Sequence, residues 1–426
     1  MRRALATIAG LAVASLALVG CTGLPGPAQT PDTTSQVDVF TSWSSGAGKL
    51  GLDSLVKVFA RQYPRVAFVD VAASSGAGSN PAAALAALLQ ADKPPDSFQA
   101  PAGAGLGDYV AAGRLQDLST FYSDSGLDDV LPASLLARLT VGGSIYSVPV
   151  AIHRVNMVWA SAALLHKAGI DPRAAPADLN AWLADLARLK HSGVTAPLAV
   201  AAAGGQVQLF ENVLLAVLGP SDYQALWNGS IGFDTPAVAR AIDYYGRLLA
   251  FTAPAGAEQD WRAAVDLLIA GDAAYTVTGD WAPIEFTASG QTYDSDYTAW
   301  PTPGTAGAFD FSADSFTLPV GAAHPDAALQ WLHTVSSDAG QKVLTLLTSS
   351  IPARTDVAPD DYPLYQQGAI AAFAADPIVS SLAYGAAVPT SWLTDITTAL
   401  GQYVTTRDAE VLQAALVQAQ QSGLGR

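Results

Sequence analysis

The sequence predicts an α/β protein in two lobes, and three observations support this fold class. The chain has 426 residues, which is two or three domains' worth of folded protein at roughly 150 residues per domain. Half of the residues are hydrophobic and only 14% are charged, which is enough apolar material for large cores. Short β-type runs alternate with amphipathic helical stretches along most of the chain.

The first elements form a strand, a helix and a second strand. Residues 37–42 (VDVFTS) are a β-type run, and residues 66–71 (VAFVDV) are another. Between them, apolar residues from Leu52 to Tyr63 recur at helical spacing and stop at Pro64. This order, with short connections, is typical of a mostly parallel sheet.

The remaining elements continue the alternation. Asn80 and Pro81 are typical N-cap and first-turn residues of a helix, which we expect to end near Ala91. A long extended run at 146–159 marks where we expect the chain to cross into a second, helix-rich lobe. Strands are predicted at 96–100, 273–278 and 311–319, a hairpin at 140–145, and helices at 105–112, 161–167, 177–190, 206–218, 236–249, 261–270 and, in the tail, 392–421.

The N-terminus predicts export and lipidation. Two arginines precede an uncharged stretch, residues 4–19, which has the length of a secretory signal and is too short for a comfortable transmembrane helix. The residues Leu18–Cys21 are similar to a bacterial lipobox, in which the cysteine is acylated and anchors the chain. The alternative is an ordinary signal with an accidental cysteine. We expect residues 1–20 to be the signal peptide and Cys21 to be the lipidation site.

A tether follows the cysteine. Residues 21–36 are rich in Pro, Gly, Thr and Ser and have no apolar periodicity, which is typical of a flexible linker. We expect this segment to hold a large acidic body at the outer face of the cytoplasmic membrane, with the body in the aqueous phase. The lipid would be the protein's only contact with the membrane.

Several function classes lack support. The chain has 21 Lys and Arg against 37 Asp and Glu, a formal charge of −16, so we expect no nucleic-acid partner. One cysteine cannot form an internal disulfide. We find no catalytic motif, no His or Cys at metal-ligand spacing and no phosphate loop, and we predict no catalytic residue, no metal and no cofactor. A hydrolase whose carboxylates come from distant positions remains an alternative.

Tryptophans at predicted strand ends and helix starts are the more informative residues. They are Trp43, Trp261, Trp281 and Trp300. An indole ring offers a flat apolar face to the C–H face of a pyranose, while nearby Asn, Asp and Gln satisfy the hydroxyl groups. Any one of these tryptophans could instead belong to a core. Several of them together favour a ligand cleft.

Six ordered stretches of the chain resemble one family, the extracellular sugar-binding proteins of ABC importers, and in particular its glucose- and mannose-binding branch. The stretches are Gly76–Asn80, Pro95–Gln99, Tyr146–Val150 with Ile152–Arg154, Gly279–Trp281, Asp314–Phe316 and Ser350–Asp356. The resemblance implies a two-lobed periplasmic-binding-protein-like fold with hinge strands and a ligand cleft between lobes that close on the sugar. We expect one lobe from residues 37–150 plus about 305–345, and the other from 151–304 plus about 346–426.

The resemblance also implies the binding residues. Trp43 matches a first-loop tryptophan, Gln99 ends the third strand, and Asp314 would bond sugar hydroxyls. Trp261 and Trp281 would stack on the sugar. The full set that we expect in the ligand site is Trp43, Asn80, Gln99, Trp261, Trp281, Asp314 and Tyr384.

Four positions depart from the family pattern. A family glutamate is replaced at Ala47 and Gly48, a histidine at Pro101, a lysine near Thr348, and a histidine at Tyr384. Because a buried polar site rejects ligands that leave its groups unpaired, such losses should change specificity. We therefore expect a retained stacking floor and altered hydroxyl recognition. One hypothesis is a larger or less polar glycan, or a glycoside whose aglycone fills the space vacated at Gly48 and Pro101.

The function expected from these features is a lipid-anchored, monomeric receptor that delivers a carbohydrate to an ABC transporter permease without catalysis. One alternative is a secreted glycan-active hydrolase or lyase that uses Asp residues in the cleft. Another is a surface glycan-binding protein that has lost transport.

Overall fold

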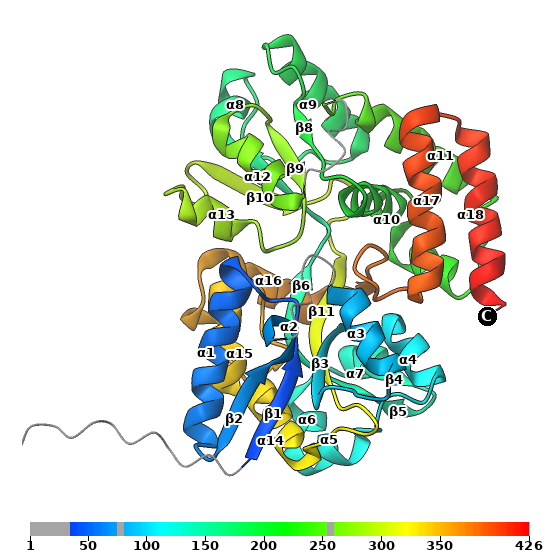
Figure 1. The fold of residues 1–426 in the computed structure, drawn as a ribbon. Helices are drawn as coiled ribbons and strands as arrows, with labels where there is room; N and C mark the ends of the chain where they lie inside the picture. Colours follow the sequence, from blue (N-terminus) through cyan, green and yellow to red (C-terminus); the bar gives the residue numbers. More distant parts are fainter. Residues whose placement is uncertain (1–34, 75–80, 254–259, 426) are drawn as a thin grey trace, which may run out of the picture. The chain divides into compact units, whose positions relative to one another are not determined.

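The computed structural model describes residues 35–74, 81–253 and 260–425. They fall in one folded unit, Thr33–Arg426, which contains two lobes, each built on its own β-sheet (Figure 1). The predicted signal peptide, Cys21, nearly all of the predicted tether, and Asn80 lie outside the described residues.

The first lobe contains a mixed six-stranded sheet. Its strands are β1 (Ser35–Phe40), β2 (Val66–Asp70), β3 (Ser97–Pro101), β6 (Ser147–Arg154), β11 (Phe309–Thr317) and β12 (Ile378–Ser380). They lie in the order β12–β11–β3–β1–β2, and β6 pairs with the other part of β11. β1 is parallel to β2 and β3, which confirms the predicted unit at the start of the chain. β11 runs antiparallel to β3 and β6, so the sheet is less uniformly parallel than predicted.

Helices cover this sheet with their apolar faces. In α1 (Gly46–Gln62), Leu52, Leu55 and Phe59 are buried at helical spacing, and Phe59 meets Trp331 edge to face with ring centroids 5.7 Å apart. Trp331 lies on α14 (Pro325–Ser336). In the sequence this helix follows the strands of the second lobe, so the chain has returned to the first lobe by this point. The other elements of this lobe are α2 (Val71–Ser74), α3 (Pro81–Gln90), η1 (Ala104–Leu106), α4 (Gly107–Ala111), α5 (Ser119–Ser125), α6 (Leu127–Val130), α7 (Ala133–Leu139), the hairpin β4 (Thr140–Val141) and β5 (Ser144–Ile145), α15 (Asp338–Thr348), η2 (Pro359–Asp361) and α16 (Leu364–Ala375).

The second lobe contains a four-stranded sheet that is mostly antiparallel, and the sequence pattern had given no pairing for it. Its strands are β7 (Met157–Ser161), β8 (Leu198–Ala199), β9 (Tyr275–Val277) and β10 (Tyr297–Pro301), in the order β10–β7–β9–β8. Only β8 and β9 are parallel. The predicted extended run at 146–159 is broken between β6 and β7, where the buried Asn156 side chain donates to Thr305 Oγ1 and to the carbonyl of Ala308.

The second lobe also contains helices from several separate parts of the chain. They are α8 (Ala162–Lys167), α9 (Leu179–His191), α10 (Gly204–Trp227), α11 (Pro236–Leu249), α12 (Trp261–Ala270), α13 (Pro283–Ala288), α17 (Thr390–Thr406) and α18 (Ala409–Leu424). Two helices merge in α10, which continues past the predicted end at residue 218. Gly219 has a φ of 74°, and Pro220 begins the next helical segment, so the helix kinks there.

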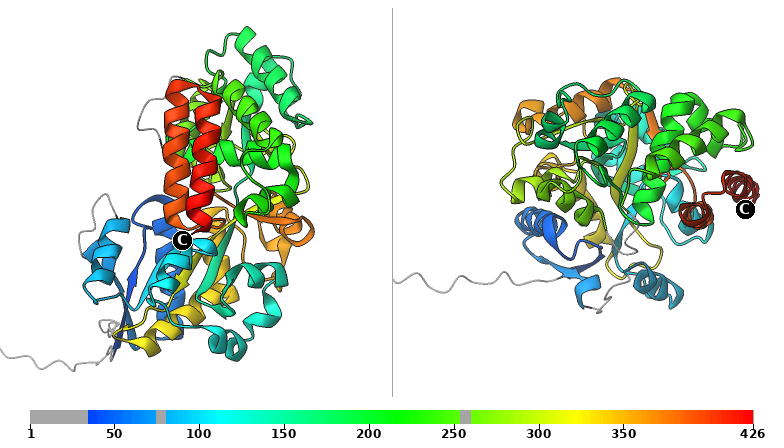
Figure 2. Two further views of the ribbon diagram at one scale, coloured as in Figure 1. Left: turned by 90° about the vertical axis from the view of Figure 1, so that its right-hand side faces the viewer. Right: turned by 90° about the horizontal axis from the view of Figure 1, so that it is seen from above.

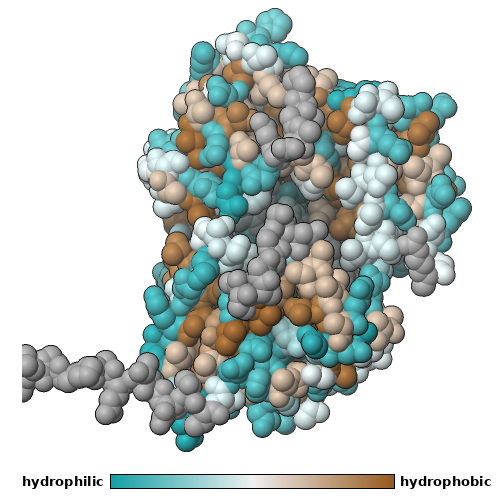
Figure 3. Space-filling view, in the orientation of Figure 1, coloured by the Kyte–Doolittle hydropathy of each residue, from teal (hydrophilic) through white to brown (hydrophobic). Residues whose placement is uncertain are grey.

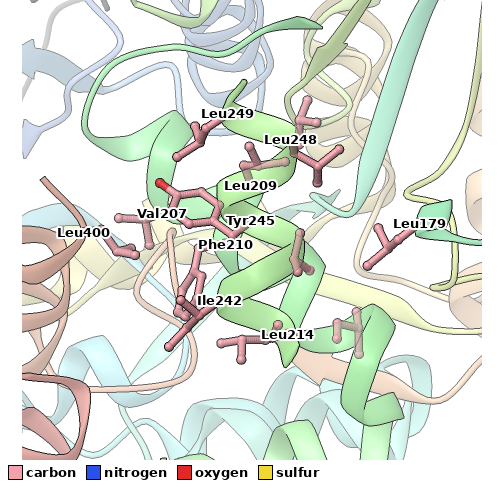
Figure 4. Packing of buried hydrophobic residues seen from close by; sticks show 14 of the residues in the cluster. Leu179, Val207, Leu209, Phe210, Leu214, Ile242, Tyr245, Leu248, Leu249 and Leu400 are labelled. Atoms are coloured by element: carbon pink, nitrogen blue, oxygen red, sulfur yellow. The ribbon is translucent and has the colours of Figure 1, made fainter. Parts of the chain in front are cut away.

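The residues of the two hydrophobic cores show where the chain passes from one lobe to the other. Phe210 on α10 and Tyr245 on α11 belong to the second lobe's core, with ring centroids 5.3 Å apart (Figure 4). Val37 and Ile351 share the first lobe's core with Phe373, although residues after about 345 were expected in the second lobe. Trp392 belongs to the second core. The lobe boundaries therefore stay a proposal, with the last crossing placed after α16, near residues 378–388.

The tail closes the second lobe. α17 and α18 lie side by side, and α17 packs on α10 while α18 packs on α11 (Figure 2). Figure 3 shows hydrophilic residues over much of one face of both lobes, with hydrophobic residues interspersed. Within the described ranges, no helix has the length and apolar character needed to cross a membrane.

Candidate ligand-binding site

Gln99 lies at the carboxyl end of β3, beside the end of β1. Its Oε1 accepts hydrogen bonds from Thr41 Oγ1 at 2.6 Å and from the backbone N–H of Ser42 at 3.0 Å. Its Nε2 donates to Asp314 Oδ1 at 2.8 Å. The amide is therefore oriented on both sides, at the edge where parallel strands of open sheets present ligand-binding groups.

Asp314 lies on β11 where the pairing with β6 shifts register, directly before Ser315. Such an irregularity re-aims a side chain. The second carboxylate oxygen of Asp314, Oδ2, lies 3.2 Å from Nε2 of His153. Asp314 is thus held by Gln99 on one side and by His153 on the other, while its side chain remains 28% exposed and open to a ligand.

His153 connects the two lobes. Its Nδ1 lies 2.6 Å from Oδ1 of Asp280, which follows β9 of the second lobe, and Asp280 Oδ2 accepts the backbone N–H of Arg154 at 2.9 Å. Burial alone would lower the pKa of His153, but the charge and hydrogen bond of Asp280, with those of Asp314, raise it to about 10. Near neutral pH the ring is an imidazolium that donates to both carboxylates.

Aromatic rings lie beside this network. Trp281 directly follows Asp280, and its Nε1 donates to Thr278 Oγ1 at 2.9 Å. Its ring meets Tyr384 at 4.9 Å, His153 at 5.4 Å and Trp261 at 6.1 Å between centroids, each edge to face. These contacts hold the indole in one orientation next to the polar network.

Trp261 opens α12. The helix is capped by Asp260, whose side chain accepts the backbone N–H of Ala263 at 3.0 Å. The guanidinium of Arg262 lies over the Trp261 ring, 4.6 Å from its centroid, and donates to Glu285 at 3.1 Å. Trp261 is therefore supported by a cation that is itself paired.

The structure corrects the expectation of empty space at Gly48. A Cβ atom there would lie 2.9 Å from Cδ1 of Trp43, so the indole ring already covers this position. Trp43 also meets Phe316 edge to face at 5.8 Å. Pro101 faces Gly385, where a Cβ would lie 3.5 Å from the proline ring. An aglycone at Gly48 would have to displace Trp43.

The structure brings the predicted site residues into two groups. One pair is Gln99 with Asp314, and the other group is Trp261, Trp281 and Tyr384; His153 joins the two. Trp43 lies near the first pair through Thr41, whose Oγ1 accepts the backbone N–H of Trp43 at 3.2 Å. All six of these predicted residues are half-buried, whereas Asn80 is outside the described residues. Their role in ligand binding stays a prediction.

One tryptophan interpretation is wrong, and the network contains two residues that the sequence did not predict. Trp300 was expected among the cleft tryptophans, but it lies buried in β10 against Tyr275. His153 and Asp280 were not among the predicted site residues. Both lie inside stretches that carried the family resemblance, Ile152–Arg154 and Gly279–Trp281. Membership of these stretches is the sequence feature that could have indicated them as site residues.

A separate cavity of about 360 Å³ lies within the second lobe. It is lined in part by Leu164, Lys167, Gln206, Leu267 and Asp272, none of which belongs to the network. The polar row (Gln99, Asp314 and His153) and the aromatic group (Trp261, Trp281 and Tyr384) are both absent from its lining. The candidate site is therefore built on the polar row and the aromatic rings.

Known proteins are similar to this chain over most of its length. The family model described as bacterial extracellular solute-binding protein matches residues 40–342. An uncharacterised ABC transporter extracellular-binding protein of Pyrococcus horikoshii is 31% identical over 425 residues, which cover 98% of this chain and 95% of that protein. A probable sugar-binding periplasmic protein of Mesorhizobium japonicum is 31% identical over 336 residues, 77% of this chain and 78% of the relative.

Solved structures share the fold. A chitin oligosaccharide binding protein matches with a TM-score of 0.77 at 19% sequence identity, over 93% of this chain and 100% of that one. The two-lobed arrangement is therefore that of the periplasmic binding proteins.

Proposed function

This chain belongs to the family of bacterial extracellular solute-binding proteins, and from that premise we propose that it binds a carbohydrate at the Gln99–Asp314–His153 row and delivers it to an ABC transporter permease. The observation that carries the proposal is this hydrogen-bonded row lying beside Trp281. Asp314 offers acceptors for hydroxyl groups, and the indole offers an apolar face.

The lobes supply different parts of the site. Gln99 and Asp314 come from the first lobe's sheet, whereas Trp261 and Trp281 come from the second lobe. A sugar that contacts both parts binds best when the lobes are closed, so ligand shifts the population towards the closed state. A closed, liganded form is what a permease can distinguish from the open form.

The charges favour a neutral sugar. The cationic groups next to the row are already paired: His153 with two aspartates, Arg262 with Glu285, and Arg154 with Asp376 at 3.5 Å. A sugar carboxylate placed beside Asp314 would meet a like charge. We therefore expect neutral saccharides to bind better than uronic acids.

Lipid anchoring and export extend the proposal. Residues 1–20 would direct export, and Cys21 would be acylated and hold the protein at the outer face of the membrane. The protein would act as a monomer, because one cleft and one ligand suffice for delivery.

The alternative of a glycan hydrolase needs an accessible carboxyl group with a raised pKa. Among the described residues, burial raises the pKa of Glu211, Asp310 and Asp280, and all three are fully buried. Burial also raises the pKa of Asp185, but this residue lies on α9 and pairs with Arg188, outside the Gln99–Asp314–His153 row. This favours a receptor without catalysis. Incubation with oligosaccharides, followed by product analysis, tests the alternative: turnover would support the hydrolase.

A thermal-shift screen tests the receptor. The purified protein is heated with glucose, mannose, galactose, xylose, maltose and chitobiose in turn, and with glucuronate as the charged comparison. Ligand at 100 times its Kd stabilises a protein by about 2.7 kcal/mol, so a binding sugar raises the Tm measurably. The proposal fails if none of these sugars, nor longer glucans and chitin oligosaccharides, shifts the Tm.

A further inference from the structure

Tyr384 is attached to α10 by its hydroxyl group. The hydroxyl donates to Oε1 of Gln208 at 3.1 Å. Gln208 is 1% exposed, and its Nε2 donates to the carbonyl of Val155 at 2.8 Å, between β6 and β7. Because the nitrogen is committed to Val155, the amide oxygen is directed at Tyr384.

Tyr384 is attached to the same helix by its backbone. Glu211, one helical turn after Gln208, accepts the backbone N–H of Ala383 at 2.8 Å and the hydroxyl of Ser381 at 3.0 Å. The Ser381 Oγ in turn accepts the backbone N–H of Tyr384 at 3.2 Å. Glu211 is fully buried, so it holds this loop without competition from water.

We propose that Gln208 and Glu211 are positioning residues of the carbohydrate site, which hold the Tyr384 ring against Trp281 before a sugar arrives. This inference rests on the proposed function. The ring centroids of Tyr384 and Trp281 lie 4.9 Å apart, edge to face, so a displaced tyrosine would free one edge of the indole. Side chains that are already ordered lose less freedom on binding, so the fixed wall raises affinity.

A double-mutant cycle tests the hydroxyl attachment. The probe is the saccharide from the thermal-shift panel that gives the largest Tm increase, and its Kd is measured by calorimetry. We expect Gln208→Leu and Tyr384→Phe each to weaken binding roughly tenfold. The double variant should be no weaker than Gln208→Leu, because each substitution removes the hydrogen bond that joins the two side chains. Additive losses, or an unchanged Kd in Gln208→Leu, would overturn the proposal.

A matched control separates positioning from general destabilisation. Gln420 is 7% exposed, lies in the same lobe, and donates to the carbonyls of Leu226 and Ile231. Gln420→Leu should lower the Tm and leave the Kd unchanged. For the backbone attachment, Glu211→Leu should weaken binding, and Glu211→Gln, which keeps an acceptor oxygen, should recover most of it.

A measurement without sugar distinguishes this inference from the proposed function. Tryptophan indole N–H signals are recorded by NMR, with Trp281 assigned from Trp281→Phe. We expect the Trp281 signal to move in Gln208→Leu and to stay in place in Gln420→Leu. If it moves while no saccharide binds, the positioning role stands and the carbohydrate assignment fails. If saccharides bind and neither the signal nor the Kd responds to Gln208→Leu, the positioning role fails alone.

Discussion

His153 Nδ1 lies 2.6 Å from Asp280 Oδ1, and this pair joins β6 in the first lobe's sheet to the loop after β9 in the second lobe. The other oxygen of Asp280 accepts the backbone N–H of Arg154, so the carboxylate is held at two points on β6. Trp281 is the next residue. The link between the lobes and the indole ring of Trp281 are thus adjacent in the chain, and a change at one should affect the other.

The His153 pair predicts that stability falls as pH rises above neutral. The folded-state pKa of His153, about 10, lies above its usual 6.5, so the stabilisation is present below about pH 6.5 and is lost as pH rises through 10. The loss should be on the order of a few kcal/mol, seen as a falling Tm between pH 7 and 10. His153→Gln should flatten this part of the curve. The exposed His166, changed to Gln, serves as the control; an equal flattening there would contradict the assignment.

The buried acids predict a second decline at lower pH. Burial raises the pKa of Glu211 from 4.5 to about 7, and burial together with the charge of Glu211 raises that of Asp310. Folding therefore takes up protons, and the stability that they contribute is present below pH 4.5 and declines towards pH 7.

Asp310→Asn isolates this second decline. The variant should reduce the decline without abolishing it, because burial by itself raises the pKa of Glu211, and it should be at least as stable as the parent at pH 8, because one buried carboxyl is removed. Chemical unfolding at both pH values measures it. An unchanged slope of stability against pH would show that Asp310 does not contribute to the decline.

The aromatic floor predicts loss of binding without loss of folding. Trp261→Ala and Trp281→Ala should each remove most of the sugar-induced rise in Tm, because stacking and apolar contact are lost. Trp227 is half-buried and packs on Trp392 away from the site, so Trp227→Phe should keep the rise. A full sugar response in both alanine variants would place the binding site elsewhere.

Gly279 predicts a steric effect on Trp281. A Cβ at this position would lie 2.4 Å from two atoms of the indole ring, closer than packing allows. Gly279→Ala should therefore displace the ring, cost about 1–3 kcal/mol in unfolding free energy, and weaken sugar binding.

The control for Gly279 is Gly401 in α17, where a Cβ would meet no atom within 4 Å. Gly401→Ala should stabilise the protein by up to about 1 kcal/mol and leave binding unchanged. Calorimetry and chemical unfolding measure both effects. A Gly279→Ala variant that binds like the parent would show that Trp281 does not need its present position.

The local sequence pattern was sufficient to predict helices that have a regular apolar face of their own. The helices at Pro236–Leu249 and Trp261–Ala270 begin and end as predicted, because each has an N-cap and a continuous apolar face. The antiparallel pairing of β11 could not be read locally, since its partners in β3 and β6 lie far away in sequence.

The site shows the same limit. Gln99 and Asp314 were predicted individually, but their hydrogen bond joins residues 215 positions apart. Nothing local distinguishes His153 from an ordinary buried histidine, because its role depends on Asp280 and Asp314 arriving from other strands. The family resemblance included the stretches that contain His153 and Asp280 but did not single out these two residues.

The strand order of the first lobe has a consequence for biosynthesis. β11 and β12 complete a sheet that begins with β1, yet β12 emerges only when nearly the whole chain has been synthesised. The first lobe begins at the N-terminus, but its sheet cannot be completed before β11 and β12 have been synthesised, because these strands pair within it. The sheet that begins at Ser35 can therefore be completed only after residue 380 has been synthesised, when most of the second lobe already exists.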